Sequence, residues 1–172
     1  MATATRRPRL FFALWPDPAT RAALARLQTG LAGRPLAAHK LHLTMAFLGQ
    51  RGAADLAPLG AILARVEAAA ATLEFDRLDY FSGQRIAWAG MGTAPPALAE
   101  LRAALMRELA AEGYAPAFER DRFRPHVTLA RQAPPLAPAA IAPLRWRADA
   151  LVLAASEGNE APYRILAARK LA

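Results

Sequence analysis

A histidine and a threonine two residues apart occur in two apolar segments, and this repeat constrains the fold more than any other feature of the chain. The first copy is "LHLTMAFLG", residues 41–49, and the second is "FRPHVTLAR", residues 123–131. Both segments are typical of β-strands. Their histidines, His42 and His126, are 84 residues apart (126 − 42), close to half of the 172-residue chain. Two copies placed in this way predict a duplicated or pseudo-symmetric fold with two lobes.

Strand alternation determines which of these side chains share a face. Residues i and i+2 of a strand point the same way, so His42 and Thr44 are expected on one face, as are His126 and Thr128. The hydrophobic residues beside them are expected on the opposite face, against helices: Leu41, Leu43, Met45 and Phe47 in the first strand, and Val127 and Leu129 in the second. If the lobes face each other, two imidazoles and two hydroxyls line one cleft.

Arginines surround the second copy of the pattern. On an extended chain, three of them share the side of His126, unless Pro125 bends the strand: Arg120, Arg122 and Arg124. Such a row attracts phosphate, because the guanidinium group matches phosphate oxygens. Strict alternation places Arg131 on the opposite face from His126. It reaches the same cleft only if the strand ends or bulges near Ala130.

The rest of the chain predicts alternating strands and helices. Strands are expected at 9–15, 72–81, 85–91, 145–156 and 163–171, with turns at Ser82-Gly83 and Gly158-Asn159. Helices are expected from Pro18 behind an Asp17 cap, from about 55 to 71, and from a Thr93 cap to Gly113. Residues 134–143 are rich in proline and are read as a connection unable to form a central strand. Interleaved helices with antiparallel hairpins indicate an α+β fold, which we expect to be a single domain over residues 1–172.

Composition excludes several classes of protein. The chain has no cysteine, which excludes disulfides and thiolate chemistry, and we expect a cytoplasmic protein. No apolar run approaches 18 residues, so no membrane partner is expected. Neither of the glycine-rich phosphate loops occurs. The net charge is +8, and all but two of the 22 Lys and Arg residues are arginine, which favours a phosphate-bearing partner but does not require one.

Two imidazoles and two hydroxyls in one cleft suit phosphodiester chemistry without a metal or other cofactor. A neutral imidazole removes a proton from water, and a protonated one gives a proton to the departing oxygen. The threonine hydroxyls donate to phosphate oxygens. A single His-x-Thr pair is more often a strand with two tolerated polar residues, whereas two matched copies favour function. A metal site at His39 and His42 is less favoured, because no third histidine or nearby carboxylate supports it.

These residues carry a family resemblance. The chain resembles the 2H phosphoesterase superfamily, which has two His-x-[Thr/Ser]-x motifs, and within it the RNA 2′,3′-cyclic phosphodiesterases, also called 2′-5′ RNA ligases. Besides both motifs, "RLFFALWP" (9–16) and "SEGNEAPYRIL" (156–166) resemble that family. The resemblance implies a bilobal α+β fold in which two antiparallel sheets flank a central cleft and helices lie outside.

The resemblance also implies an activity: opening of a terminal RNA 2′,3′-cyclic phosphate to a 2′-phosphomonoester. It implies that His42 protonates the departing 3′ oxygen and that His126 activates water. Thr44, Thr128 and Arg131 are then expected to hold the phosphate. Strand spacing, and not the resemblance, adds Arg124 as a further binding residue. The residues alone do not say which histidine has which role.

Three alternatives stay open at this point. One is an RNA- or nucleotide-binding module without turnover, which the intact motifs disfavour. Another is the same chemistry on a small cyclic nucleotide. The third is reversible 2′-5′ RNA ligation. We expect a monomer that binds RNA or an oligonucleotide with a cyclic phosphate end.

Overall fold

The fold is a long antiparallel sheet that bends into two halves, with helices on its outer side. The computed structural model describes residues 7–115 and 123–172. Its strands are β1 (Arg9–Leu14), β2 (Arg34–Pro35), β3 (Leu43–Gln50), β4 (Ala71–Phe81), β5 (Ile86–Gly90), β6 (His126–Arg131), β7 (Ala139–Ala148), β8 (Ala150–Ser156) and β9 (Arg164–Lys170). The helices are α1 (Pro18–Arg26), α2 (Leu56–Arg65) and α3 (Pro96–Ala111), with 3-10 turns η1 (Ala38–Lys40) and η2 (Ala53–Asp55).

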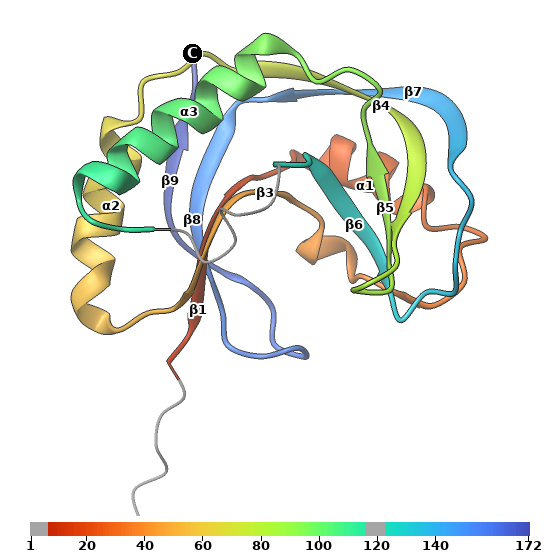
Figure 1. Ribbon diagram of the computed structural model, residues 1–172, viewed down its shortest axis with the longest axis horizontal. Helices are drawn as coiled ribbons and strands as arrows, with labels where there is room; N and C mark the ends of the chain where they lie inside the picture. The colour runs from red at the N-terminus through yellow and green to blue at the C-terminus, as the bar shows by residue number, and fades with distance from the viewer. Residues whose placement is uncertain (1–6, 116–122) are drawn as a thin grey trace, which may run out of the picture.

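The strand order divides the sheet into two halves of four strands each. The order is β7-β4-β5-β6-β3-β1-β8-β9, with the short strand β2 added beside β6. All pairs are antiparallel, but β3 and β6 are joined through one residue pair, Leu43 and Val127. The two strands that carry the repeated motif therefore meet at the centre, and each belongs to a different half. This is the expected bilobal α+β fold, with the motif strands flanking the central line (Figure 1).

The helices cover the back of both halves. Two of them, α1 and α3, each cover the half opposite to that of the strand they follow. Helix α1 follows β1 but contacts β7 of the other half, whereas α2 contacts β8 and β9 and also packs on α3. Figure 1 shows α2 and α3 together beside β8 and β9, away from the β4–β7 half. Helix α3 follows β5 of one half in the sequence but lies over β8 and β9 of the other half. Each half is thus covered by a helix that leaves from the other.

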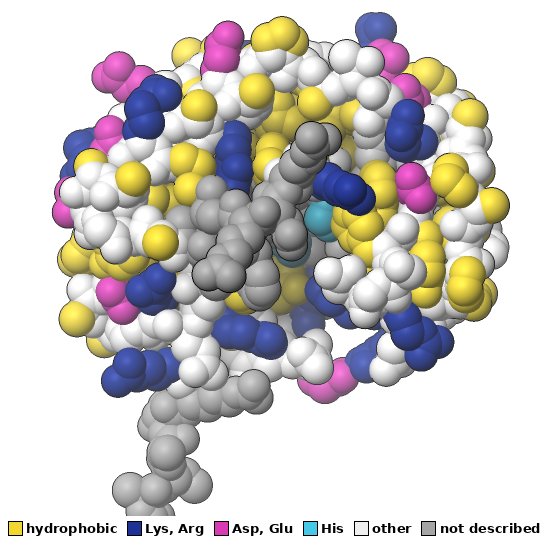
Figure 2. Space-filling view, viewed as in Figure 1, with side chains coloured by type: hydrophobic (Ala, Val, Ile, Leu, Met, Phe, Trp, Pro, Cys, Tyr) yellow, Lys and Arg dark blue, Asp and Glu magenta, His cyan; other side chains and the backbone are white. Residues whose placement is uncertain are grey.

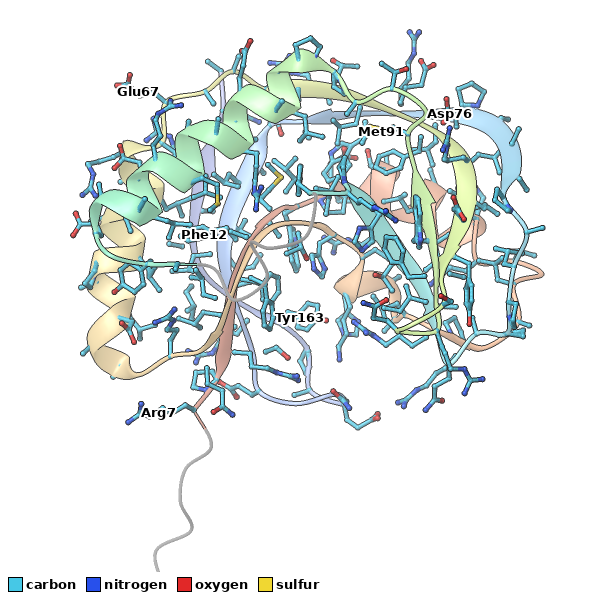
Figure 3. All side chains as sticks on the ribbon, viewed as in Figure 1. Arg7, Phe12, Glu67, Asp76, Met91 and Tyr163 are labelled. Atoms are coloured by element: carbon cyan, nitrogen blue, oxygen red, sulfur yellow. The ribbon has the colours of Figure 1, made fainter. Side chains whose placement is uncertain are left out.

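The core lies between the back of the sheet and these helices. In β1, Leu10, Phe12 and Leu14 belong to the large buried cluster, and Leu59, Ile62 and Leu101 join it from α2 and α3. Burying such side chains removes apolar surface from water, which is the main favourable term in folding. Figure 3 shows Phe12 on the side of α3 and Tyr163 on the opposite side of the sheet.

The capping chemistry of α1 is confirmed, while two helix bounds differ from those predicted. Asp17 caps α1 by accepting a hydrogen bond from the Thr20 backbone N–H at 2.9 Å. Helix α3 begins behind Pro95 and not behind Thr93, because a residue that precedes proline is disfavoured in helical conformation. Helix α2 ends at Arg65, not at residue 71, because the chain enters the long strand β4 at Ala71.

The segment from 134 to 156 also differs from its prediction. The predicted strand 145–156 is two strands, β7 and β8, separated by Asp149 and belonging to different halves. Part of the predicted connection, from Ala139 onward, pairs with β4 as β7. β7 lies at the edge of the sheet, which is where a strand that contains Pro143 is tolerated.

No helix within the described ranges is long and apolar enough to cross a membrane.

Candidate active site

A cavity of about 440 Å³ lies between the two halves and collects the predicted side chains. His42, Thr44, His126, Thr128 and Arg131 all line it. Histidine side chains lie in the hollow at the centre of the face in Figure 2. Arg124 does not line the cavity; it lies with its guanidinium 6.0 Å from the ring centre of Phe81. Arg120 and Arg122 lie outside the described residues.

A bulge in β6 brings Arg131 to the cavity. Trp88 of β5 pairs with Thr128, but its neighbour Ala87 pairs with Ala130, so Leu129 is an extra residue. Leu129 and Ala130 are both buried, and alternation resumes so that Arg131 shares the cavity with His126 and Thr128. The bulge that Arg131 requires is therefore present.

The same bulge occurs in β3, where the sequence did not reveal it. Ala13 of β1 pairs with Thr44, but Phe12 pairs with Ala46, which makes Met45 the extra residue. Met45 and Ala46 both enter the core, and Phe47 turns to the cavity. The prediction that Phe47 faces the helices is therefore wrong. Phe47 holds in the first motif the position that Arg131 holds in the second.

Side chains from outside the sheet hold both bulges in place. Gln28 Nε2, just beyond α1, donates to the carbonyl oxygens of Leu129 and Leu36 at 2.8 Å each. Arg102 Nε on α3 donates to the carbonyl oxygen of Met45 at 2.5 Å. The carbonyl of each extra residue thus accepts from a side chain outside the sheet, one in the turn after α1 and one on α3. The sequence analysis missed Gln28 and Arg102, since no local signal marks a donor to a distant backbone oxygen.

His42 is held in one orientation and one tautomer. Its Nδ1 lies 2.6 Å from the carbonyl oxygen of Lys40, so Nδ1 carries the proton and donates. Its Nε2 lies 3.0 Å from Thr44 Oγ1, whose hydroxyl donates to the neutral ring. The ring stacks on Trp15 with 5.7 Å between centroids, and Phe11 and Tyr163 contact it at 5.0 and 5.3 Å.

His126 repeats this arrangement with different neighbours. Its Nδ1 donates to the carbonyl oxygen of Arg124 at 2.7 Å, which leaves Nε2 as the free ring nitrogen. Phe81 contacts the ring edge to face at 5.0 Å, and Trp88 lies at 5.8 Å. The Trp88 side chain lies against Gly90, where a Cβ atom would be 2.3 Å from the indole. Gly90 therefore makes room for the ring that supports His126.

Both histidines are neutral near pH 7 in the free protein. Burial lowers the pKa of His42 from 6.5 to about 4; the carbonyl of Lys40 opposes this, and the charges of His126 and Arg131 add to it. Burial also lowers the pKa of His126, again against its backbone hydrogen bond and with Arg131. An anion between the histidines would oppose the charge effects and raise both pKa values.

Cationic groups at the cavity differ in their partners. Lys40 is buried, donates to the Asn159 carbonyl oxygen at 2.6 Å and lies 5.2 Å from the ring centre of Tyr163. Arg34 forms an ion pair with Glu160 across the mouth of the cavity. Arg131 lowers both histidine pKa values and, within the described residues, has no ion-pair partner. Arg131 is thus a cation beside the histidines that is left free to meet an anion.

A metal site finds no support in the donor set. Within residues 7–115 and 123–172, no cluster of three or more His, Asp or Glu side chains is suited to hold a metal ion. His39 also borders the cavity, but it lies in η1 while His42 is bonded through both ring nitrogens.

Comparison with known proteins assigns the family. The profile of the 2′-5′ RNA ligase superfamily matches residues 15–160. The chain belongs to this family of LigT-type 2H phosphoesterases.

Two curated relatives are each named RNA 2′,3′-cyclic phosphodiesterase. One, from Escherichia coli, is 38% identical over 59% of this chain and 57% of its own length. The other, from Thermus thermophilus, is 35% identical over 87% of this chain and 82% of its own length. Crystal structures of E. coli LigT are 29% identical, cover 96% of this chain and 98–99% of theirs, and have TM-scores of 0.81 in apo form and 0.79 complexed with 3′-AMP.

Proposed function

We propose that this protein is an RNA 2′,3′-cyclic phosphodiesterase that opens the cyclic end to a 2′-phosphomonoester without a metal. The observation that carries the proposal is a pair of imidazoles, His42 and His126, each anchored through Nδ1 to a backbone carbonyl and bordering one cavity with Arg131. The names of the two curated relatives support the choice of substrate.

In the proposed reaction water attacks phosphorus and the P–O3′ bond breaks. His126 takes the proton from water through Nε2, and His42 gives a proton to the departing O3′, so the histidines exchange protonation states in one turnover. Thr44, Thr128 and Arg131 bind the non-bridging oxygens, where charge increases in the transition state.

Binding of the negative substrate makes it favourable for His42 to carry a proton, which the free site disfavours. In the free protein, Arg131 and burial disfavour a proton on either histidine. The negative phosphodiester favours a protonated His42, so the acid is charged when substrate is bound. Both imidazole states are then present together.

The test is product analysis on an oligonucleotide with a 2′,3′-cyclic phosphate end, in EDTA. The expected product is the 2′-phosphomonoester alone, at the rate measured without EDTA. A 3′-phosphomonoester product would contradict the P–O3′ cleavage. Activity lost in EDTA and restored by one divalent ion would contradict the proton-transfer mechanism.

The superfamily description favours a second reaction at the same site. If an RNA 5′-hydroxyl replaces water, the same bond breaks and a 2′-5′ phosphodiester forms, with His126 as base. We expect this ligation to run in reverse as well, so a 2′-5′-linked dinucleotide should yield the cyclic phosphate end. Absence of that product with active enzyme would exclude ligation.

A further inference from the structure

Beyond the histidines, the cavity extends over the face of the β3-β1-β8 half, while β2 and Gln132 border it from the other half. On the β3-β1-β8 side its wall includes Phe11, Phe47 and Ser156, and it reaches Arg9 at the outer end of β1. From the other half, Phe81 and Trp88, which support His126, do not line it. Part of the open space beyond the catalytic groups therefore lies along β1, toward the end of the strand where Figure 3 labels Arg7.

Arg9 faces this space because β1 pairs regularly with β8. Its register, from Arg9 opposite Ser156 to Leu14 opposite Leu151, contains no shift. Arg9, Phe11 and Ala13 therefore share one face. Ala13 pairs with Thr44, so the Cα of Arg9 lies roughly 13 Å along the strand from the residue beside Thr44, at about 3.3 Å per residue. The wall between them is apolar, formed by Phe11 and Phe47.

Arg34 and Lys40 have partners within the protein, whereas Arg9 and Arg131 have no ion-pair partner among the described residues. Arg34 is paired with Glu160, and Lys40 is bound by Asn159 and Tyr163. Arg131 stands beside the histidines. Arg9 is half-buried and, among the residues that the structure describes, no carboxylate pairs with it. A guanidinium group at the far end of an apolar trough, opposite a catalytic phosphate site, matches a second phosphate.

We propose that Arg9 binds the 5′ phosphate of the terminal nucleotide, so that the site prefers oligonucleotide ends to nucleoside 2′,3′-cyclic monophosphates. This rests on the proposed function. In an in-line displacement the leaving O3′ lies opposite the attacking water. With His42 as the acid, the ribose lies on the His42 half, and its 5′ side continues over Phe11 and Phe47 toward Arg9. A 5′-hydroxyl offers the guanidinium no charge to bind.

The test measures kcat/KM for two substrates that differ in one group, adenosine 2′,3′-cyclic phosphate with and without a 5′ phosphate. The ratio of the two values is compared between the wild type and Arg9→Gln. We expect the wild-type ratio to favour the 5′-phosphorylated substrate and to fall about 10- to 100-fold in Arg9→Gln, the range for losing hydrogen bonds to a charged group. Arg9→Lys should lie between the two, since it keeps the charge and loses the fork.

Arg107→Gln is the matched control, because it makes the same change of charge at an exposed position on the outer helix α3. It should keep the wild-type ratio, whereas a general electrostatic effect would lower the ratio in both variants and overturn the proposal. An unchanged ratio in Arg9→Gln would also overturn it.

Equilibrium binding separates this proposal from the proposed function. Adenosine 2′,5′-bisphosphate should bind the wild type more tightly than adenosine 2′-monophosphate, and Arg9→Gln should lose that difference. These measurements need no turnover. If the wild type hydrolyses neither cyclic substrate, the proposed function fails, and the binding comparison still decides the role of Arg9. Equal binding of both ligands by the wild type would overturn it.

Discussion

The two motif strands have the same backbone and different chemistry. Along β3 and β6 a histidine at or just before the first residue, a threonine and a bulged residue follow in the same order, and each histidine is fixed through Nδ1 to the carbonyl two residues before it. The next side chain into the cavity is Phe47 in one strand and Arg131 in the other. The duplicated backbone thus provides two equivalent imidazoles, while one residue after each bulge makes the two ends of the cleft unequal.

The surroundings of the histidines differ as well. His42 is enclosed by Phe11, Trp15 and Tyr163 and bonded to Thr44, and its pKa is about 4. A ring so stabilised in the neutral form acts as an acid only when an anion is bound. Among the described residues, His126 has two aromatic neighbours, Phe81 and Trp88, and no such bond to Thr128.

Removal of either histidine should have the largest effect. His42→Ala and His126→Ala should each lower kcat/KM by about 10²- to 10⁴-fold, and the double variant little further, because the two act as one unit. A phosphodiester with a p-nitrophenyl leaving group needs no acid, so its hydrolysis should be restored in His42→Ala and not in His126→Ala. Rescue of His126→Ala instead would reverse the two roles. Losses below about tenfold in both would exclude them as the catalytic pair.

Substitution of the residues after the two bulges, Arg131 and Phe47, should distinguish the effect of charge from the effect of packing. Arg131→Gln should lower kcat by about 10²- to 10³-fold, the usual cost of removing one transition-state donor. Phe47→Leu keeps an apolar side chain and should cost less than tenfold, mainly in KM. Steady-state kinetics on a nucleoside cyclic phosphate measures both. A larger loss of activity in Phe47→Leu than in Arg131→Gln would mean that packing, and not charge, causes the difference between the two ends of the cleft.

The donor behind the β6 bulge should matter for stability and catalysis together. Gln28→Ala removes two hydrogen bonds to backbone oxygens and should lower the free energy of unfolding by about 1–3 kcal/mol. It should also lower kcat, because the bulge directs Arg131 to the cavity. Denaturant unfolding and kinetics measure the two effects. Thr29→Ala, at the exposed next position, is the control and should stay within about 0.5 kcal/mol. Loss of stability with unchanged kcat would mean that the bulge persists without Gln28.

Titration of the histidines should give the smallest and most local effect. In NMR spectra of the free protein, His42 should titrate near pH 4, and His126 below 6.5. Inorganic phosphate should raise both values. Between pH 6.5 and about 4 the unfolded chain binds a proton that the folded His42 does not, so the free energy of unfolding should fall as pH is lowered through that range. A His42 that titrates at its ordinary pKa without phosphate would contradict the enclosure of its ring.

The sequence predicted the fold class and the meeting of both motifs in one cavity, because strand alternation and a repeat are local patterns. It did not predict the β3 bulge, so Phe47 was assigned to the wrong face. The sequence did indicate that Arg131 needs a bulge near Ala130 to reach the cavity, because strict alternation places it on the opposite face from His126. The break between β7 and β8 at Asp149 was missed because it depends on pairing partners that are distant in the sequence. β7 pairs with β4, and β8 pairs with β1. The donors Gln28 and Arg102 were missed for the same reason.

The strand order also determines when the site can form during folding. The four main strands of the half that carries His126 come from one continuous stretch, 71–148, whereas the half that carries His42 pairs β1 with β8 and so joins segments about 140 residues apart. Closing so long a loop is entropically costly and makes such contacts slow to form. We therefore expect strands β4–β7 to be protected early from amide hydrogen exchange during refolding and β1 late. The wall that carries Arg9, Phe11 and the ring neighbours of His42 would be the last part of the site to acquire its structure.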